Sequence, residues 1–407
     1  MKCGLLGRHL GHSYSPQIHA MLGSYSYVLF EKEPEQVEDF LKNGDWTGIN
    51  VTVPYKKTVI PYLDELTPVA KKLGAVNTII RRAGKLIGHN TDYFGFQVLL
   101  DTLPIPLEHQ KTLVLGSGGA SNTAVAVLRD KGAQVVVISR TGENNYQNLH
   151  LHQDARLIVN TTPVGMYPDT GVSPVDLNLF PCLRSVLDMV YNPARTQFLL
   201  DAEAADKGIH YRNGLLMLVA QAKEAAEWFT GDCISDDVID PIMKKLEAQM
   251  QNIVLIGMPG CGKSTIGKLL SEKTGRIFID ADEQIIHKAG KSIPEIFAND
   301  GEEVFREWET KALVELGKQS GLIIATGGGC VTKERNYKLL HQNGTIFWIR
   351  RKLDDLPTKG RPLSEQTNLR EMYRIREPLY DSWKDRFIDN FSTPEDAANG
   401  ILAALEV

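Results

Sequence analysis

"IVLIGMPGCGKSTIG" occupies residues 253–267 and decides how the C-terminal part of this chain folds. An apolar run leads into a glycine-rich bend, and a lysine, a serine and a threonine follow. Gly257, Gly262, Lys263 and Ser264 match the spacing G-x-x-x-x-G-K-[ST] between an expected strand and an expected helix. This context predicts a P-loop, whose amides surround the phosphates of ATP while the lysine reaches the β/γ oxygens and the serine hydroxyl binds Mg²⁺. The residues expected at the nucleotide are Gly257, Gly260, Gly262, Lys263, Ser264 and Thr265.

The bulk composition limits the class of protein. The chain has 407 residues, 43% of them hydrophobic and 23% charged, so we expect two or three domains with buried cores. The net charge of −5 gives no reason to expect a nucleic-acid partner, and no apolar stretch is long enough to span a bilayer. The five cysteines have no CxxC spacing and the N-terminus has no signal-peptide core, which favours a cytoplasmic location. The oligomeric state stays open.

Short apolar runs alternate with helical patterns along the whole chain, which predicts an α/β architecture. The runs after residue 100 are apolar on both faces, as strands of a parallel sheet covered by helices would be. The segment "IIRRAGKLIGHN" at 79–90 predicts a hairpin that turns at Ala83-Gly84. A polar helix at 235–252 is the expected linker, and we place the main boundary near residue 248.

A second glycine-rich turn, "LVLGSGGAS" at 113–121, joins an expected strand to an expected helix. Glycines let the backbone approach a pyrophosphate, which then meets the helix N-terminus. The next strand ends in Ser139-Arg140-Thr141, where an NAD-preferring fold has an acidic residue, so a guanidinium there favours NADP. The alternative is a solvated surface arginine. The residues expected at this cofactor are Gly116, Gly118, Gly119, Ala120, Ser121, Ser139, Arg140 and Thr141.

Uncharged hydrogen-bonding clusters precede this turn, namely "GHSYSPQIH" at 11–19, "NVTVPYK" at 50–56, "GAVNT" at 74–78 and "GHNTDYFG" at 88–95. Hydroxyl and amide groups in that number suit an oxygen-rich substrate in a cleft at strand ends. Lys56 and Asp92 are the pair in these clusters that could exchange a proton. A lysine held beside a carboxylate can protonate the alkoxide that forms when hydride reaches a carbonyl. Spacing alone does not choose between Lys56 and Lys57, and Ser13 or Asp92 could instead cap a helix.

These four motifs, with "NTTPVGM" (160–166), "LDMVYNP" (187–193) and "LLMLVAQA" (215–222), resemble the shikimate dehydrogenase family over about residues 1–248. The resemblance implies reduction of 3-dehydroshikimate by NADPH, with Lys56 and Asp92 as the catalytic pair. It also implies a substrate-binding domain at 1–100, completed by helices at about 215–246, and a Rossmann-type NADP domain at 101–214. The implied substrate contacts are Ser13, Ser15, Thr52, Asn77, Tyr191 and Gln221.

The C-terminal part also needs a carboxylate for its metal ion and a site for an acceptor. "IFIDAD" supplies Asp280 and Asp282 at a strand end, so that one can serve Mg²⁺ while the other faces an acceptor hydroxyl. Arg306, Arg361 and Arg376 suit a bound carboxylate, although surface ion pairs with nearby glutamates are the alternative for each arginine.

The P-loop, the D-x-D, "FR", "GGG", "RPL" and "REPLY" motifs together resemble shikimate kinase over about 250–407. The resemblance implies a parallel-sheet, nucleoside-monophosphate-kinase-like domain with a lid at 354–368. The implied roles are metal binding for Ser264 and Asp280, catalysis for Lys263 and Asp282, substrate binding for Asp282, Arg306, Gly328, Gly329 and Arg376, and lid contact with ATP for Arg361.

The two halves together predict one chain that makes shikimate from 3-dehydroshikimate and then phosphorylates it, with NADP(H), ATP and Mg²⁺. Two alternatives stay open. One half could have lost catalysis and act as a nucleotide-sensing regulatory module, or the first enzyme could use quinate and NAD.

Overall fold

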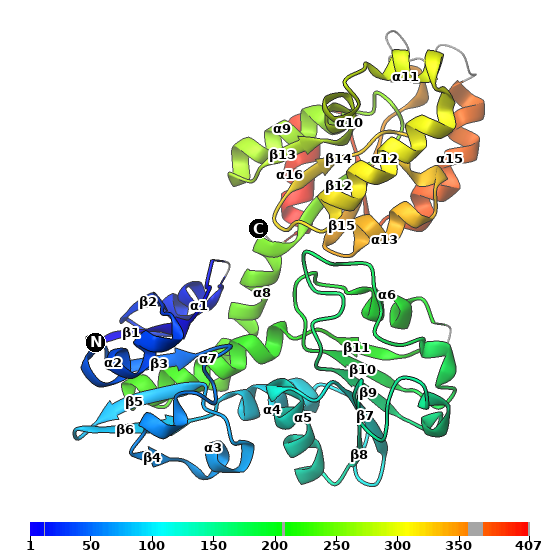
Figure 1. Ribbon diagram of the computed structural model, residues 1–407. Coiled ribbons are helices and arrows are strands. Elements are labelled where there is room, and N and C mark those ends of the chain that lie inside the picture. The colour runs from blue at the N-terminus through cyan, green and yellow to red at the C-terminus, as the bar shows by residue number, and fades with distance from the viewer. Residues whose placement is uncertain (12, 206–207, 357–368, 406–407) are drawn as a thin grey trace. The chain divides into compact units, whose positions relative to one another are not determined.

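The computed structural model describes residues 1–11, 13–205, 208–356 and 369–405. The chain divides into two compact units (Figure 1). The first comprises Met1–Val164, Ser173–Tyr191 and Asp201–Lys245, and the second comprises Gly165–Val172, Asn192–Leu200 and Leu246–Val407. Parallel sheets with helices against them occur in both units, which confirms the predicted α/β class.

The N-terminal sheet of the first unit is mixed, in the order β2-β1-β3-β5-β6-β4. Strands β1 and β3 are almost entirely buried, whereas β2 lies at the edge. The strands are β1 (Lys2–Gly7), β2 (Ser26–Glu31), β3 (Gly48–Val51), β4 (Glu65–Leu66), β5 (Thr78–Arg82) and β6 (Lys85–His89), and the helices are α1 (Ser15–Leu22), α2 (Val37–Asn43), α3 (Pro68–Leu73) and α4 (Asp92–Asp101).

The predicted hairpin is confirmed by β5 and β6, which pair antiparallel with Arg82 opposite Lys85. Ala83 and Gly84 form the turn with φ angles of 51° and 77°. Two successive positive φ angles are what a two-residue turn needs to match the twist of its strands. The hairpin carries the chain directly into residues 90–92 at the start of α4.

The second sheet of this unit is entirely parallel, in the order β11-β10-β9-β7-β8. Its central strands are buried along nearly their whole length, as the apolar runs predict. The strands are β7 (Lys111–Leu115), β8 (Gln134–Ile138), β9 (Leu157–Asn160), β10 (Ser185–Asp188) and β11 (His210–Arg212), and the helices that accompany them along the chain are α5 (Gly119–Asp130) and α6 (Gln197–Glu203).

Helix α7 (Leu215–Thr230) brings the chain back to the N-terminal sheet, where it packs on α4, α1, β3 and β5. It ends at Gly231, whose φ of 80° is the left-handed conformation that stops a helix. Helix α8 (Ile239–Met250) follows, at the place where the polar linker helix is predicted.

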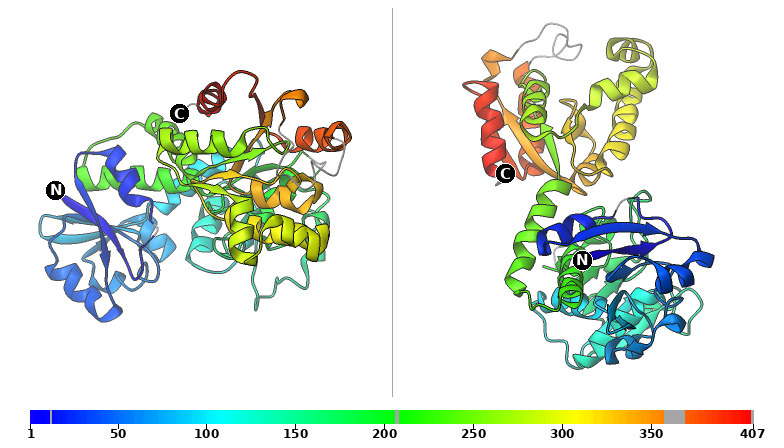
Figure 2. Two further views of the ribbon diagram at one scale, coloured as in Figure 1. Left: turned by 90° about the horizontal axis from the view of Figure 1, so that it is seen from above. Right: turned by 90° about the vertical axis from the view of Figure 1, so that its left-hand side faces the viewer.

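The sheet of the second unit is parallel in the order β13-β14-β12-β15-β16, with the P-loop strand β12 in the centre. Helices α9 and α16 pack together on one face, and α12 and α13 cover the other (Figure 2). The strands are β12 (Asn252–Ile256), β13 (Phe278–Asp280), β14 (Ile323–Ala325), β15 (Gly344–Arg350) and β16 (Arg386–Asp389), and the helices are α9 (Lys263–Thr274), α10 (Ala281–Ala289), α11 (Ile293–Asn299), α12 (Gly301–Gly317), α13 (Arg335–His341), α15 (Leu369–Trp383) and α16 (Pro394–Ala404).

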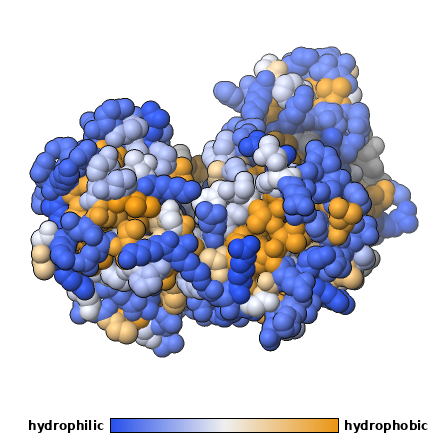
Figure 3. Space-filling model, turned by 60° about the horizontal axis from the view of Figure 1, so that its bottom comes forward, coloured by the Kyte–Doolittle hydropathy of each residue, from blue (hydrophilic) through white to orange (hydrophobic). Residues whose placement is uncertain are grey.

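Hydrophilic side chains cover most of the face drawn in Figure 3, and apolar side chains appear between them in separate patches. Among the helices of the described residues, none has both the length and the apolar composition that crossing a membrane requires.

Candidate active sites

Lys56 and Asp92 meet in the first unit although 36 positions separate them. Lys56 Nζ donates to Asp92 Oδ2 at 2.7 Å, and the two side chains are 30% and 15% exposed. Lys57 is exposed, so the tertiary fold chooses between the neighbouring lysines. Asp92 begins α4, but its carboxylate binds Lys56 while its own N–H donates to Asn90 Oδ1 at 3.0 Å. The pair is therefore held at a strand end, partly exposed and able to reach a ligand.

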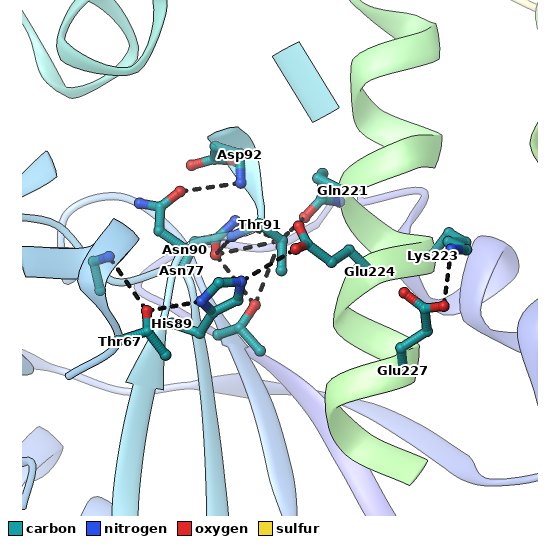
Figure 4. Close-up of polar contacts among 12 residues, drawn as sticks. Thr67, Asn77, His89, Asn90, Thr91, Asp92, Gln221, Lys223, Glu224 and Glu227 are labelled. Atoms are coloured by element: carbon teal, nitrogen blue, oxygen red, sulfur yellow. Dashed lines mark hydrogen bonds and ion pairs between the residues drawn. The ribbon is translucent and has the colours of Figure 1, made fainter. Parts of the chain in front are cut away.

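Asn77 and Gln221 lie on either side of Thr91, a residue that the sequence analysis did not single out (Figure 4). The Thr91 N–H donates to Asn77 Oδ1 at 2.7 Å, and its hydroxyl lies 3.3 Å from Gln221 Oε1. Asn77 and Thr91 are buried. Helix α7 and the residue before β5 thus bring two amides to the same threonine.

The other predicted substrate contacts come from other elements, before and at the start of α1, after β3 and after β10. Ser13 Oγ accepts the N–H of Ser15 at 3.2 Å, but the N-cap residue of α1 is Tyr14 and no side chain of the described residues caps this helix. Thr52 is half-buried and follows β3. The Tyr191 ring meets Tyr14 edge-on with centroids 6.2 Å apart, and burial raises the pKa of Tyr191 above its usual value.

The glycine-rich turn of the first unit connects β7 to α5 as predicted. Gly116 has a φ of 108°, and a Cβ there would come within 2.8 Å of Thr161 Oγ1, so glycine is required. Gly118 and Gly119 are exposed, and a Cβ on either would meet nothing within 4 Å. Open space at the N-terminal amides of α5 fits a pyrophosphate, while Ser121 is buried and packs inward.

At the end of β8, Arg140 and Thr141 are exposed and Ser139 is half-buried. The following loop is held by hydrogen bonds, including that from the Ser139 N–H to the Asn144 carbonyl at 3.1 Å. His152 also contacts Asn144, with Nε2 3.0 Å from Oδ1. A guanidinium displayed on an ordered loop fits the 2′-phosphate that the sequence predicts there.

The P-loop of the second unit ends in a buried lysine. Lys263 Nζ donates to the carbonyl oxygens of Gly257 at 2.9 Å and Met258 at 3.0 Å. Gly257 has a φ of 141°, and a Cβ there would lie 2.5 Å from the Ile349 carbonyl oxygen, so this glycine permits close approach to β15. A cavity of about 630 Å³ opens at the loop and includes Lys263 in its wall.

The predicted metal residues meet in this cavity. Ser264 Oγ donates to Asp280 Oδ2 at 2.6 Å, and the other oxygen of Asp280 accepts the N–H of Asp282 at 3.0 Å. Asp280 therefore also caps α10. A hydroxyl and a carboxylate beside the P-loop are the hard oxygen donors that suit Mg²⁺, so these residues fit the ion.

The basic residues of this cavity are buried rather than paired on the surface. Arg306 is 3% exposed and donates to Glu309 at 2.9 Å and Glu302 at 2.9 Å. Arg376 is 7% exposed and donates to the Gly328 carbonyl oxygen at 3.3 Å. Burial raises the pKa of Glu309 to about 7, against the opposing charge of Arg306. Two buried arginines, each held by hydrogen bonds to other protein groups, thus line the cavity.

Glu309 is a site residue that the sequence analysis missed. A Cβ at Gly327 would lie 2.6 Å from Glu309 Oε1 and 2.9 Å from Asp282 Oδ1, so both carboxylates point to the same place. The signal was present in the spacing, because residues three apart on a helix share a face and Glu309 is three positions after Arg306. Arg361 and the core of the predicted lid lie outside the described residues.

Comparisons with known proteins find a match for each of the two parts of the chain. Residues 5–79 match the family model for the shikimate dehydrogenase substrate binding domain, and residues 259–406 match that for shikimate kinase. A shikimate dehydrogenase (NADP(+)) from Clostridium perfringens (strain SM101) is 35% identical over 269 residues, covering 60% of this chain and 98% of the relative.

Solved structures resemble the N-terminal part. The shikimate 5-dehydrogenase of Thermus thermophilus, in complex with NADP(H) and shikimate, has a TM-score of 0.55 and 33% identity over 60% of this chain and 99% of that one. A chorismate mutase/shikimate 5-dehydrogenase fusion protein from Clostridium acetobutylicum has a TM-score of 0.57 and 36% identity over 60% of this chain and 96% of that one.

Fold and sites together define a two-part α/β enzyme, with a strand-end Lys-Asp pair in one part and a P-loop cavity in the other. The chain belongs to the shikimate dehydrogenase family and carries a shikimate kinase domain in its C-terminal part. Both resemblances predicted from the motifs are confirmed.

Proposed function

We propose that the first unit reduces 3-dehydroshikimate to shikimate with NADPH, and that the second phosphorylates the 3-hydroxyl of shikimate with ATP. The observation that carries the first half is the 2.7 Å contact between Lys56 and Asp92 at a strand end. The second half is carried by the cavity in which Lys263, Ser264 and Asp280 meet the buried arginines. Both activities would then act on one small cyclic acid.

In the first site, NADPH supplies the hydride when bound. The glycine-rich turn at 116–121 would hold its pyrophosphate, and Arg140 would hold the 2′-phosphate. Lys56 Nζ protonates the oxygen of the carbonyl as that oxygen gains negative charge, and Asp92 keeps the ammonium group in place. Asn77 and Gln221 orient the ring by hydrogen bonds from their amides.

In the second site, ATP with Mg²⁺ supplies the phosphoryl group. Ser264 and Asp280 would hold the ion, and Lys263 would release the loop carbonyls to bind phosphate oxygens. Arg306 and Arg376 bind the substrate carboxylate, which guanidinium groups match geometrically. Asp282 accepts a hydrogen bond from the hydroxyl that is phosphorylated.

The test is the full-length protein given 3-dehydroshikimate, NADPH, ATP and Mg²⁺, with products separated by chromatography. We expect shikimate 3-phosphate, formed with equal consumption of NADPH and ATP. Lys56→Ala should abolish reduction and leave phosphorylation of added shikimate intact, whereas Lys263→Ala should do the reverse. Loss of both activities in either folded variant contradicts the assignment.

A second candidate is oxidation of quinate with NAD in the first site. A quinate dehydrogenase from Corynebacterium glutamicum in complex with NAD aligns with a TM-score of 0.54 and 26% identity over 60% of this chain. The exposed guanidinium of Arg140 favours NADP instead. Comparing kcat/KM for shikimate with NADP and for quinate with NAD decides between the two.

A further inference from the structure

A half-buried tyrosine on the edge strand β2, Tyr27, begins a run of hydrogen bonds that ends at the proposed substrate amides. Tyr27 Oη donates to Asn50 Oδ1 at 2.7 Å. The Tyr27 ring stacks on His19, with centroids 4.0 Å apart and planes at 10°, and His19 is fully buried. Burial also raises the pKa of Tyr27 well above its usual value, so its hydroxyl keeps its proton and can donate.

Asn50 and Thr78 continue the run, and each accepts a hydrogen bond from the residue before it and donates one to the next. Because Asn50 Oδ1 accepts from Tyr27, its Nδ2 faces the other way and donates to Thr78 Oγ1 at 3.1 Å. Thr78 is fully buried, and its hydroxyl lies 3.1 Å from Asn77 Oδ1, to which it donates. A hydroxyl that accepts one hydrogen bond can still donate one, so Thr78 accepts from Asn50 and donates to Asn77.

The same direction continues through Asn77 and Thr91. Asn77 Oδ1 accepts both the Thr78 hydroxyl and the Thr91 N–H at 2.7 Å, which uses its two lone pairs. Asn77 Nδ2 donates to Thr91 Oγ1 at 3.0 Å. The Thr91 hydroxyl lies 3.3 Å from both Asn77 Oδ1 and Gln221 Oε1 (Figure 4). Because the Asn77 oxygen already accepts two hydrogen bonds, we assign the hydroxyl proton to Gln221.

The hydrogen bonds that Asn77 and Gln221 already make decide which of their amide groups remain for a ligand. Both lone pairs of Asn77 Oδ1 are used, so Asn77 has only an N–H group left for a ligand, whereas Gln221 Oε1 accepts one hydrogen bond and keeps a second lone pair. Gln221 Nε2 uses one of its two hydrogens on the Leu218 carbonyl oxygen at 2.9 Å, which leaves the other. Two donors at one place bind oxygen lone pairs, as the hydroxyl or carboxylate groups of a polyhydroxylated acid provide them.

We propose that Tyr27, Asn50 and Thr78 are positioning residues of the dehydrogenase site, which hold the Asn77 amide in place as a hydrogen-bond donor toward the substrate. This inference rests on the proposed dehydrogenase function. The Thr91 N–H fixes which way the Asn77 amide faces, and the Thr78 hydroxyl is the second partner of its oxygen. Without the Tyr27 hydroxyl, Asn50 loses a partner and holds Thr78, and through it Asn77, less firmly. A neutral hydrogen bond contributes about 1 kcal/mol, so substrate binding should weaken by about three- to tenfold.

The experiment compares Tyr27→Phe with Tyr25→Phe in the full-length protein. Tyr25 is the matched control, because its hydroxyl contacts the same His19 at 2.6 Å but is not part of the run. We expect Tyr27→Phe to raise the KM for shikimate by about three- to tenfold, with the KM for NADP and kcat within about twofold of wild type. Tyr25→Phe should keep the wild-type KM, even if its melting temperature falls.

A double-mutant cycle separates one continuous run from two independent effects. Thr78→Val interrupts the run two bonds later while keeping the shape of the side chain. If Tyr27 acts through Thr78, the double variant should have nearly the KM of Thr78→Val alone. A double variant in which the two single effects multiply would overturn the proposal.

The outcomes for the inference and for the proposed function are distinct. A wild-type protein that turns over no 3-dehydroshikimate would remove the proposed function. If the wild-type protein is active and the Tyr27→Phe and Tyr25→Phe variants have the same KM for shikimate, only the positioning role is removed.

Discussion

A methyl group added at Gly329 should disable the kinase site without touching its chemistry directly. A Cβ at this position would lie 2.2 Å from Nη2, 2.4 Å from Nη1 and 2.5 Å from Cζ of Arg306. The backbone is no obstacle, because Gly329 has a φ of −103° and a ψ of 3° that other residues can adopt. The added methyl of Gly329→Ala therefore acts mainly through its collision with the guanidinium group, in the wall of the cavity that Gly329 lines.

The size of the effect follows from how tightly Arg306 is held. Non-bonded heavy atoms need about 3.5 Å, so the guanidinium must move by about 1 Å. It is 3% exposed and bound to Glu309 and Glu302 at 2.9 Å each, so it cannot move without losing buried charged contacts. A displacement of about 1 Å in a positioning group costs about 100-fold, so kinase kcat/KM for shikimate should fall by about that factor.

The assay is coupled ADP release at varied shikimate, and the reduction of 3-dehydroshikimate by the same preparation is the internal control. Gly400→Ala is the matched variant, because a Cβ there meets Ile388 at an ordinary 3.5 Å within helix α16. Gly400→Ala should keep full kinase activity and stabilise the fold slightly, since alanine favours a helix. If Gly329→Ala kept kcat/KM within about threefold of wild type, the placement of Arg306 would not govern substrate binding.

Three further results are expected. Arg140→Ala should raise the KM for NADPH about tenfold, because one charged hydrogen bond to the 2′-phosphate is lost. The KM for NADH should not change, and equal changes for both cofactors would contradict the role of Arg140. Burial lowers the pKa of His19 to about 3, so below about pH 6.5 the unfolded chain binds a proton that the folded one does not. Urea unfolding should therefore show a loss of about 2 kcal/mol between about pH 6.5 and 5 that His19→Gln lacks; the same slope in both proteins refutes this. Asp280→Asn should raise the Mg²⁺ concentration for half-maximal kinase activity at least about tenfold, and unchanged Mg²⁺ dependence would remove Asp280 from the metal site.

The sequence alone was sufficient for features that depend on neighbours along the chain. Strand and helix periodicity predicted the α/β class, and the turn at Ala83-Gly84 followed from a glycine between two apolar runs, although Ala83 also adopts a positive φ there. The P-loop was predictable because its glycines, lysine and serine act within one strand-turn-helix segment. Such local rules need no knowledge of where the rest of the chain lies.

Residues that act together from distant segments could be predicted only in part. Spacing alone left Lys56 and Lys57 equal and the family resemblance favoured Lys56, but only the folded chain brings Lys56 to Asp92 and leaves Lys57 exposed. Thr91 and Glu309 were missed, because each works through contacts with two other elements. Side-chain direction depends on the register of strands and helices, which pattern and spacing leave undetermined.

The order of amino acids by itself determined the two glycine-rich turns, the strands before them and the chemical types gathered at their ends. Only the tertiary structure decided which way each buried amide and guanidinium faces. The run from Tyr27 to Gln221 shows the reason, since it crosses from β2 through β3 and β5 to α7. Every hydrogen-bond donor in it is oriented by a partner that the chain reaches only on folding.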